Sequence, residues 1–409
     1  MKICWILTKA KFNICTGNRI YTDTLLSYSY KEDEWMGFKF NEIDELVILG
    51  CKASTNEFEG KFYCFPPGTK ITIIGPYEKY QKESGVLDRL RNIFLFVKEI
   101  IANRKKFYNI DFCFASYFEY LAFIIFGLKI IGTKAKIITN VIGDYPTWNY
   151  AKHKNLFFKW YLLTHQKICQ WASDEVWFIS DYLQKLYGNG QKNEFVIHNS
   201  PISEKQIGGP KGLTSDTITL VFVGRFEAEK SPQTVFYAAD ILKKRGVKIV
   251  LKIVGSGSLT NEIKNLARDL NLMEETEFYG RVYNRKKIFE LFRGAHFFIF
   301  PSLHGEGFPF VTMEAMSQGV VIVTTPSGGV PEIIIDGKTG ILVSRIDDND
   351  SAEEISKEIA DAIYHLIVYP ELYAKISALA VERAKELTIE KFGIVQRRHI
   401  QDLLRHPLF

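Results

Sequence analysis

Ile218-Thr-Leu-Val-Phe-Val-Gly-Arg225 is a β-branched and aromatic run that ends on a glycine, which is typical of a buried strand opening into a loop. A helical stretch follows at 232–244, and a second apolar run at 247–254 ends at Gly255. Continuous apolar strands that alternate with helices predict a parallel sheet covered on both faces. The same pattern continues with expected strands at 276–279, 295–300, 320–324 and 340–343 and expected helices at 259–270, 285–293 and 309–318.

The first half of the chain alternates in the same way, but less regularly. Between the halves, Gly and Pro residues gather in 200–215, which is typical of a linker. We therefore expect an α/β fold of two doubly wound, Rossmann-like domains, 1–200 and 201–388, that face one another across a cleft. In such sheets, ligands bind beyond the carboxyl ends of the strands. The strands expected in the first half are 2–7, 45–49, 69–74, 112–115, 135–141, 175–178 and 194–197. We expect the stretches between them to be helical, notably 86–106 and 152–172.

Composition and charge narrow the classes of function. The chain has 409 residues, of which 46% are hydrophobic and 24% charged, so it is a globular protein and not a disordered one. Its net charge of +5 is too small to indicate a nucleic-acid partner. Residues 1–200 hold 26 Lys and Arg against 20 Asp and Glu, whereas 201–409 hold 26 against 27. The basic excess of the first half fits an anionic substrate or an anionic membrane surface.

The cysteines and the apolar runs indicate in which cellular compartment the protein is found. The six cysteines all lie in the first half, and no two form a C-x-x-C pair. We expect buried free thiols in a reducing compartment, hence a cytoplasmic protein. No export signal is visible, and the most apolar stretch, 120–131, is shorter than the roughly 20 residues that cross a bilayer.

Two cations follow the strand that ends at Val223. Arg225 offers a planar fork of hydrogen-bond donors, and Lys230 offers a mobile point charge. Gly224 lets the backbone approach a ligand closely. Two such cations at a strand end suit a diphosphate. Taken alone, the same residues also fit a solvated surface turn.

A loop and a helix start carry two carboxylates. A glycine-containing loop follows the strand that ends near Phe300, and we expect a short helix from Pro309. The unpaired N–H groups of a helix start bind anions. Glu314, about one turn into the helix, can accept hydrogen bonds from two adjacent ribose hydroxyls, and Glu306 lies in the loop, near where a sugar would sit. Taken alone, the two acids also fit the helix dipole.

Three further segments resemble known ligand motifs. The run Ser327-Gly-Gly-Val-Pro-Glu332 is another glycine loop at a strand end. The run Gly255-Ser-Gly257 lacks the third glycine of a dinucleotide fingerprint, so we expect a tight turn there. Asp347-Asp-Asn-Asp350 contains an Asp-x-Asp, the kind of pair that holds a metal. Because Ser351-x-x-Glu354 follows it as a capping box, we expect a loop and helix cap, and no metal site.

Together these motifs resemble the retaining glycosyltransferases of family four, the glycosyl transferases group 1, which have the two-domain GT-B fold. The resemblance is clear over 218–343 and weaker over most of the rest. It is carried by Gly224-Arg225 with Lys230, by Glu306 and Glu314 with seven residues between them, and by the runs 327–332 and 337–343.

The resemblance implies a role for each matched residue and a metal-independent reaction without a cofactor. Arg225 and Lys230 would hold the diphosphate of a nucleotide-sugar, Glu306 would contact the donor sugar, and Glu314 would bind the ribose. The closing stretch 389–409 would pack back on the first domain. Further donor contacts would come from Gly17 and Gly224, from the nucleobase loop with Arg281 and Val282, and from the backbone of Gly307, Phe308, Phe310, Val311 and Thr312.

The first half departs from the family pattern at two loops. The loop after the first strand usually carries a Gly-Gly pair, whereas here it holds Gly17 alone, with Arg19 as a further cation. The family often has a His-Asp pair after a central strand, whereas here Asp144 follows a glycine. Asp144 is therefore the candidate on the acceptor side, and His153 and His165 are the alternatives for the missing His.

Basic amphipathic sequence occurs at 86–106 and at 152–172, where Lys and Arg accompany aromatic and aliphatic residues. Such helices can rest on an anionic membrane, or can simply face the core on one side and solvent on the other.

From the motifs and the resemblance, the first hypothesis is a transferase that moves a sugar to a glycan or lipid-linked acceptor. An inactive nucleotide-sugar-binding partner subunit and a sugar-nucleotide epimerase are the alternatives.

Overall fold

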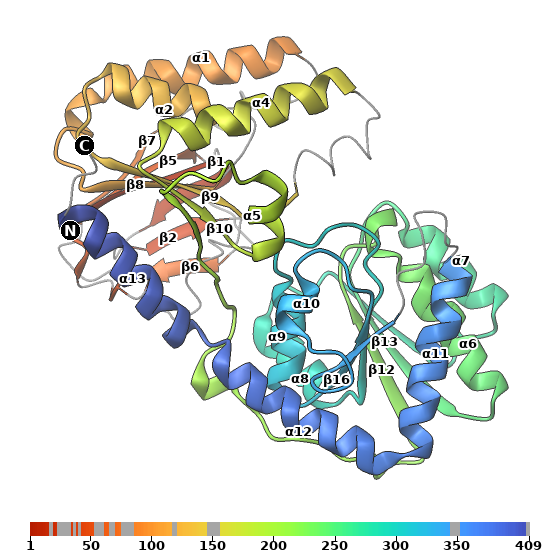
Figure 1. Cartoon of the computed structure of the whole chain (residues 1–409). Helices are drawn as coiled ribbons and strands as arrows, with labels where there is room; N and C mark the ends of the chain where they lie inside the picture. Colours follow the sequence, from red (N-terminus) through yellow and green to blue (C-terminus); the bar gives the residue numbers. More distant parts are fainter. Residues whose placement is uncertain are drawn as a thin grey trace. The chain divides into compact units, whose positions relative to one another are not determined.

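The chain divides into two compact units. The computed structural model describes residues 1–15, 19–22, 34–35, 38–39, 42–52, 61–64, 70–74, 86–116, 121–144, 156–343 and 352–405. Unit 1 comprises Met1–Asn199 with Glu390–Phe409, and unit 2 comprises Ser200–Ile389. Each unit is an α/β domain around a mainly or wholly parallel sheet (Figure 1), so the expected fold class is confirmed.

The sheet of unit 1 contains seven parallel strands in the order β7-β5-β1-β8-β9-β10-β11. The strand order reverses at β1, as in other doubly wound sheets. The fully buried side chains of Ile137 and Ile138 on β9 show that both faces of this strand are covered. The strands are β1 Lys2–Cys15, β5 Glu45–Lys52, β7 Lys70–Ile74, β8 Phe112–Ser116, β9 Lys136–Val141, β10 Glu175–Phe178 and β11 Glu194–Val196.

The sheet also has an antiparallel extension that the sequence did not predict. Strand β1 continues past the expected Leu7 to Cys15, and its end pairs with β2 (Arg19–Thr22), which pairs with β6 (Lys61–Cys64). A separate two-stranded ladder joins β3 (Glu34–Trp35) and β4 (Phe38–Lys39).

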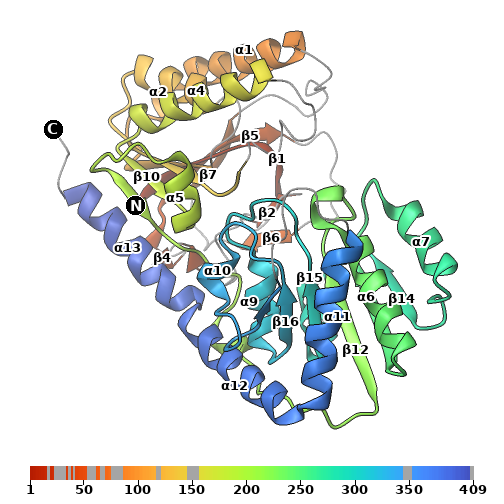
Figure 2. The same ribbon diagram turned by 45° about the vertical axis from the view of Figure 1, so that its right-hand side comes forward.

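Helices α1, α2 and α4 lie side by side over one face of this sheet (Figures 1 and 2), with α2 in contact with both neighbours. The two long helices agree with the sequence except at their ends, since α1 stops at Ala102 and α4 is described from Leu156. The bounds in unit 1 are α1 Val86–Ala102, η3 Arg104–Lys106, α2 Leu121–Ile130, α4 Leu156–Ala172, α5 Asp181–Tyr187 and α13 Ile389–Arg405.

The last helix, α13, packs on unit 1. Gln396 donates a hydrogen bond to the carbonyl of His198 at 3.0 Å, and Arg397 makes a two-pronged ion pair with Glu42 at 2.6 and 3.0 Å. The ring of His399 meets Phe195 edge-on, with 4.6 Å between ring centroids. These contacts are made to residues that precede unit 2 in the chain, so unit 1 is discontinuous in sequence.

The sheet of unit 2 has six parallel strands in the order β14-β13-β12-β15-β16-β17. The strand order reverses at β12, so β12 and β15 flank the switch point of a doubly wound sheet. The sequence located every one of these strands to within about two residues. Their bounds are β12 Thr217–Val223, β13 Lys248–Val254, β14 Thr276–Gly280, β15 Phe297–Phe300, β16 Val321–Thr324 and β17 Ile341–Leu342.

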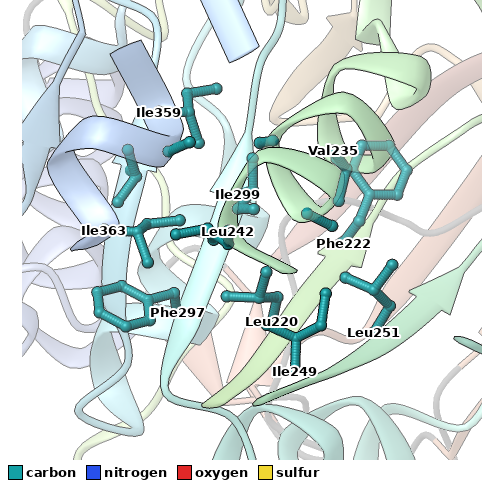
Figure 3. Packing of buried hydrophobic residues seen from close by; sticks show 14 of the residues in the cluster. Leu220, Phe222, Val235, Leu242, Ile249, Leu251, Phe297, Ile299, Ile359 and Ile363 are labelled. Carbon is teal, nitrogen blue, oxygen red and sulfur yellow. The ribbon is translucent and has the colours of Figure 1, made fainter. Parts of the chain in front are cut away.

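Helices cover both faces of this sheet. Val235 and Leu242 of α6 and Ile359 and Ile363 of α11 meet the strand residues of the core on one face (Figure 3). Burying each such side chain contributes about 1.5–3 kcal/mol. On the opposite face, Phe292 of α8 meets Phe298 edge-on at 5.2 Å. The helices are η4 Glu204–Gln206, η5 Ala228–Lys230, α6 Pro232–Lys244, α7 Thr260–Asp269, α8 Arg285–Arg293, α9 Phe310–Ser317, α10 Val330–Ile333, α11 Ala352–Val368 and α12 Pro370–Glu386.

The segment that the sequence predicts as a linker is bonded along the body of unit 2. The amide of Gly208 donates to the carbonyl of Ser317 at 2.7 Å, and that of Lys211 donates to the Ser377 hydroxyl at 2.8 Å. The Lys211 ammonium also donates to the carbonyls of Phe292 and Ala295 at the end of α8, at 2.8 and 2.7 Å. The segment therefore belongs to unit 2, which begins at Ser200, one residue before the expected start at 201.

Candidate functional site

The candidate site lies at the carboxyl ends of β12 and β15, where the strand order of unit 2 reverses. Lys230 follows β12 and Glu306 follows β15, and their side chains form an ion pair. The two strands are hydrogen-bonded neighbours, so the loops that leave them meet at the same edge of the sheet. A switch point between adjacent strands is where doubly wound sheets bind ligands.

Lys230 is held in place by its surroundings. It ends the short helix η5, its ammonium lies 5.4 Å from the ring centre of Phe300, and its side chain is mostly buried. The next residue, Ser231, is a non-glycine residue with φ +43° and ψ +53°, in the left-handed region. Its hydroxyl is bonded to that of Thr234 at 2.8 Å. Left-handed backbone costs a serine about 1–2 kcal/mol, and such strain clusters at functional sites.

Glu306 receives a second hydrogen bond and a fixed backbone. The Ser302 hydroxyl donates to the same carboxylate oxygen that binds Lys230. The amide of Gly329 donates to the Glu306 carbonyl at 2.7 Å. Gly328 has φ +58°, and a Cβ there would lie 2.2 Å from that carbonyl oxygen. The double glycine of the 327–332 run therefore allows the loop after β16 to lie directly against the loop that carries Glu306.

Arg225 lies at the end of β12, but it does not join the Lys230–Glu306 cluster. Its side chain is 55% exposed and pairs with Glu229 at 2.7 Å. An exposed pair of this kind contributes at most about 1 kcal/mol, so Arg225 can exchange Glu229 for an anionic ligand at little cost. Nearby, the amide of Gly224 donates to the carbonyl of Val254 at 3.0 Å.

The Gly255-Ser-Gly257 run is explained by close backbone packing. Gly255 has φ +143°, and a Cβ there would lie 1.8 Å from the carbonyl oxygen of Gly224. A Cβ at Gly257 would lie 2.4 Å from the carbonyl oxygen of Phe226. The two glycines thus let the loops after β12 and β13 lie against each other, in agreement with the expected tight turn.

Glu314 on α9 is buried and paired with a residue that the sequence reasoning missed. Its side chain is 10% exposed, and Nη2 of Arg285 donates to its Oε1. The same guanidinium group donates to the carbonyl of Pro201 at 3.2 Å. A signal for Arg285 existed: as the first residue of α8 it places a cation at the positive end of a helix dipole, which is unfavourable without a compensating acid.

The start of α9 differs in detail from the expectation. The helix begins at Phe310, with Pro309 as the flanking residue, and Phe308 before it is buried. The amide of Thr312 donates to the carbonyl of Pro309 at 3.2 Å, and its hydroxyl donates to the same oxygen at 2.6 Å. Among the amides expected to bind phosphate, that of Thr312 is thus bonded within the first turn. Gly307, before this turn, and Val311, within it, are half-buried.

The expected nucleobase loop follows β14 at the same edge of the sheet. Arg281 is exposed, with its guanidinium group 4.7 Å from the ring centre of Tyr283, and Val282 is half-buried. Burial, together with a hydrogen bond to Glu277, raises the pKa of Tyr279 to about 12, so this hydroxyl stays protonated at neutral pH.

The candidates of unit 1 have other partners or lie outside the described residues. Asp144, just beyond β9, accepts a hydrogen bond from the Tyr187 hydroxyl of α5. His165 is buried, and its Nε2 accepts the amide of Ala122 at 3.1 Å, in the first turn of α2. Burial lowers the pKa of His165 to about 4, so it is a neutral helix cap. Gly17, His153 and the Asp347–Asp350 segment lie outside the described residues, and Arg19 is described in backbone only.

The thiols that the structure describes agree with the sequence. Cys4, Cys113 and Cys169 are buried, and Cys113 and Cys169 are free thiols. Burial raises the pKa of the Cys169 thiol well above its ordinary value, so this thiol is uncharged at neutral pH.

Comparison with known proteins shows what the residues around the site resemble. Residues 204–383, which contain all the unit 2 candidates, match the family model described as Glycosyl transferases group 1. The D-inositol 3-phosphate glycosyltransferase of Paenarthrobacter aurescens is 35% identical over 153 residues, which are 36% of this chain and 36% of that protein. The capsular polysaccharide biosynthesis glycosyltransferase CapM of Staphylococcus aureus is 24% identical over 253 residues, 57% of this chain and 65% of CapM. The matches thus span between about a third and two thirds of these relatives.

Solved structures share the fold over nearly the whole chain. The crystal structure of HepE from Anabaena, solved with UDP and glucose, covers 98% of this chain and all of its own, with a TM-score of 0.68 and 14% identity. This likeness shows the two-domain GT-B fold.

Proposed function

We propose that this chain transfers a sugar from a nucleotide-diphospho-sugar, a proposal supported by the match of residues 204–383 to the glycosyl transferases group 1 family model. The observation that carries the proposal is the Lys230–Glu306 pair at the switch point between β12 and β15. The Lys230 cation and the Glu306 carboxylate come from loops about 76 residues apart in the sequence. The loop after β16 can lie against Glu306 only because residue 328 is a glycine, and the residue after Lys230, Ser231, has a strained left-handed backbone.

The chemistry of sugar transfer accounts for the charges of this cluster. The bond from the sugar to the diphosphate breaks through an oxocarbenium-like state, while negative charge grows on the departing diphosphate. Lys230 and Arg225 would stabilise that charge, and Glu306 would orient the donor sugar while holding Lys230. Fixed donors of this kind are each worth about 2.7–4 kcal/mol of barrier. Because these side chains supply positive charge, we propose that the reaction needs no divalent metal or cofactor.

The remaining site residues would bind the rest of the donor. Glu314, oriented by Arg285, would accept hydrogen bonds from the ribose hydroxyls, and Arg281 and Val282 would flank the base. Gly224, Gly307, Phe308, Phe310, Val311 and Thr312 would line the diphosphate and sugar, and Gly17 and Asp144 would act from unit 1. We further propose that the anomeric configuration is retained, as the resemblance to family four implies. HepE was solved with UDP, which makes a UDP-sugar the first donor to test.

We propose that the acceptor is a glycan or a lipid-linked molecule, and that the transfer takes place in the cytoplasm. The support is the likeness to CapM, whose name assigns it to capsular polysaccharide biosynthesis. Asp144 would stand on the acceptor side, although its bond to the Tyr187 hydroxyl means that it would have to exchange partners to take part.

The test separates binding from chemistry. Thermal unfolding is followed with UDP, GDP and ADP and with their glucose conjugates, because a ligand at about 100 times its Kd adds about 2.7 kcal/mol of stability. The best donor is then incubated alone, and release of free sugar is followed by NMR, which also reports the anomer first formed. The proposal expects one nucleotide to raise the melting temperature and its sugar to be slowly hydrolysed with retention.

Arg225→Ala is the matched variant, since Arg225 is exposed and its loss leaves the fold intact. Turnover should fall about 10²–10³-fold at an unchanged melting temperature. Arg268→Ala on α7, which removes another exposed arginine bonded to a near neighbour, should leave turnover unchanged. Binding without any turnover would favour the inactive partner subunit, and release of an epimerised sugar would favour the epimerase. A fully active Arg225→Ala protein would contradict the proposal.

A further inference from the structure

The outer face of α4 carries large apolar side chains in one stripe. Phe157 is 77% exposed and Trp171 is 71% exposed, and between them Trp160 and Ile168 are also exposed. Their spacings of three, eight and three residues bring them to one side of the helix. The opposite side, with Leu162, is buried. Together with Leu156, which is 68% exposed, α4 therefore leaves five large apolar side chains in contact with solvent, although their burial would stabilise the fold.

The neighbouring helices continue this stripe into a broad face. On α2, Phe123, Phe126 and Ile130 are exposed at spacings of three and four residues, and on α1, Phe94 and Ile101 are exposed. Helix α2 contacts both α1 and α4, and the three lie side by side in Figures 1 and 2. We call these nine side chains the helical face; they are Phe94, Ile101, Phe123, Phe126, Ile130, Phe157, Trp160, Ile168 and Trp171.

The charges of α2 and α4 have one sign, whereas α1 carries Asp88 and Glu99 as well as basic residues. Helices α2 and α4 contain three lysines, Lys129, Lys159 and Lys167, and no Asp or Glu. Lys129 and Lys167 are exposed beside the apolar stripe, as is Lys98 on α1. A second copy of the chain would bring these cations against themselves if it docked face to face, and like charges oppose such a dimer.

An anionic lipid surface satisfies both properties of the face. Aromatic rings, tryptophan above all, settle at the boundary between headgroups and acyl chains, while nearby lysines meet the anionic headgroups. Among the described residues, no helix combines the length and the apolar character that crossing a bilayer requires. Helices that lie flat on the membrane need neither, because they bury only one side.

We propose that the helical face docks unit 1 on an anionic membrane surface, with Trp160 and Trp171 entering the headgroup region and Lys98, Lys129 and Lys167 neutralising lipid charge. This surface is built from unit 1 alone and is separate from the Lys230–Glu306 cluster of unit 2. Its occupancy does not depend on which sugar or nucleotide the chain uses.

Co-sedimentation of the full chain with lipid vesicles tests the proposal. Vesicles of phosphatidylcholine are compared with vesicles in which about a third of the lipid is phosphatidylglycerol. The chain should sediment with the anionic vesicles at about 50 mM salt and be largely released at about 500 mM, because salt screens exposed charges. Binding that ignores lipid charge and salt would overturn the proposal.

Two sets of variants locate the surface. Trp160→Ser with Trp171→Ser should lower the vesicle partition coefficient at least tenfold. The triple variant Lys98→Gln, Lys129→Gln and Lys167→Gln should lower it about a hundredfold, at roughly fivefold for each lysine. All these side chains are exposed, so the melting temperature without vesicles should stay within about 2 °C of the wild type.

The matched control removes the same charge from unit 2. Lys264, Lys357 and Lys375 lie exposed on α7, α11 and α12, and their triple change to Gln should leave vesicle binding unchanged. If both triple variants lose binding equally, net charge and not the helical face attracts the lipid, and the proposal is wrong. The proposal is also wrong if the wild type self-associates in sedimentation velocity without lipid and the double tryptophan variant is monomeric, because the face is then a contact between copies.

Discussion

Nη2 of Arg285, at the first position of α8, is bonded to Oε1 of Glu314, in the second turn of α9. The pair joins the two helices of unit 2 that follow β14 and β15, and both side chains are largely buried. One carboxylate oxygen of Glu314 is thereby fixed in direction before any ligand arrives. A carboxylate that is oriented in advance binds a diol with less loss of side-chain entropy than a mobile one.

Arg285→Ala should weaken nucleotide binding about tenfold to a hundredfold, because a hydrogen bond to a charged group is worth about 1.5–3 kcal/mol. Isothermal titration with the nucleotide that stabilises the chain best measures this loss. Arg285→Lys should recover part of it, and Lys286→Ala, at the exposed neighbouring position, should cause none. Tighter binding by Arg285→Ala would show that the arginine competes with the ribose for Glu314.

Lys230 and Glu306 should behave as one unit in a double-mutant cycle. Lys230→Met and Glu306→Gln should each lower turnover about 10²–10³-fold, since each leaves its buried partner without compensation. The turnover of the double variant should be no lower than that of the less active single variant, because the effects of two substitutions that remove one shared interaction do not add. Steady-state donor hydrolysis gives all four rates, and losses that simply add would contradict a direct functional coupling.

Gly328→Ala should impair the site far more than the fold. Its φ of +58° strains an alanine, and its Cβ would press on the backbone of Glu306 at 2.2 and 2.5 Å. Gly337 offers the control, since its φ is +65° but nothing lies within 4 Å of a Cβ there. Gly337→Ala should lose about 1–2 kcal/mol of stability in urea unfolding, and Gly328→Ala should lose more, because its Cβ also displaces backbone atoms. Only Gly328→Ala should lose turnover, by at least tenfold, and equal turnover in the two would contradict this reading of the loop.

Acid should destabilise unit 1 through His165. Its pKa is lowered to about 4 by burial, whereas an unfolded histidine titrates near 6.5. Between these values the unfolded chain binds the extra proton, so stability falls as the pH drops from 6.5 towards 4. Thermal unfolding between pH 7 and 5 should show a steeper fall for the wild type than for His165→Gln, which cannot titrate. Parallel curves would mean that His165 has no part in the acid response.

The alternation of strands and helices in unit 2 could be predicted because its strands are strongly apolar, and β15 and β16 are buried on both faces. Phe297, Phe298, Ile299 and Phe300 are all buried, so the strand is a continuous apolar run bounded by polar loops. Glu306 and Glu314 could be located at the same edge of the sheet from local sequence alone, because both follow closely the strand that ends at Phe300. The roles that the sequence assigns to these residues stay predictions, and the site variants above test them.

Contacts between distant residues could not be predicted in the same way. Glu306 meets Lys230, and Glu314 meets Arg285, only because strand order brings separate loops together, and no local pattern encodes that order. The stretch that contains helix α2 was expected to be helical, but its bounds could not be predicted, because its short run is apolar on nearly every side and shows no helical period. The glycines and prolines of 200–215 predict a linker, whereas the amide of Gly208 is hydrogen-bonded to the carbonyl of Ser317 in the body of unit 2.

The position of α13 affects how the chain can be made. During synthesis the ribosome makes the strands of unit 1 first and then all of unit 2. Only afterwards does it make helix α13, which carries Gln396 and Arg397. Unit 2 can thus complete its core while unit 1 still waits for its final helix, with the Glu42 carboxylate and the Phe195 ring lacking their α13 partners. A nascent chain stalled before residue 390 would therefore hold a finished second domain tethered to an unfinished first one.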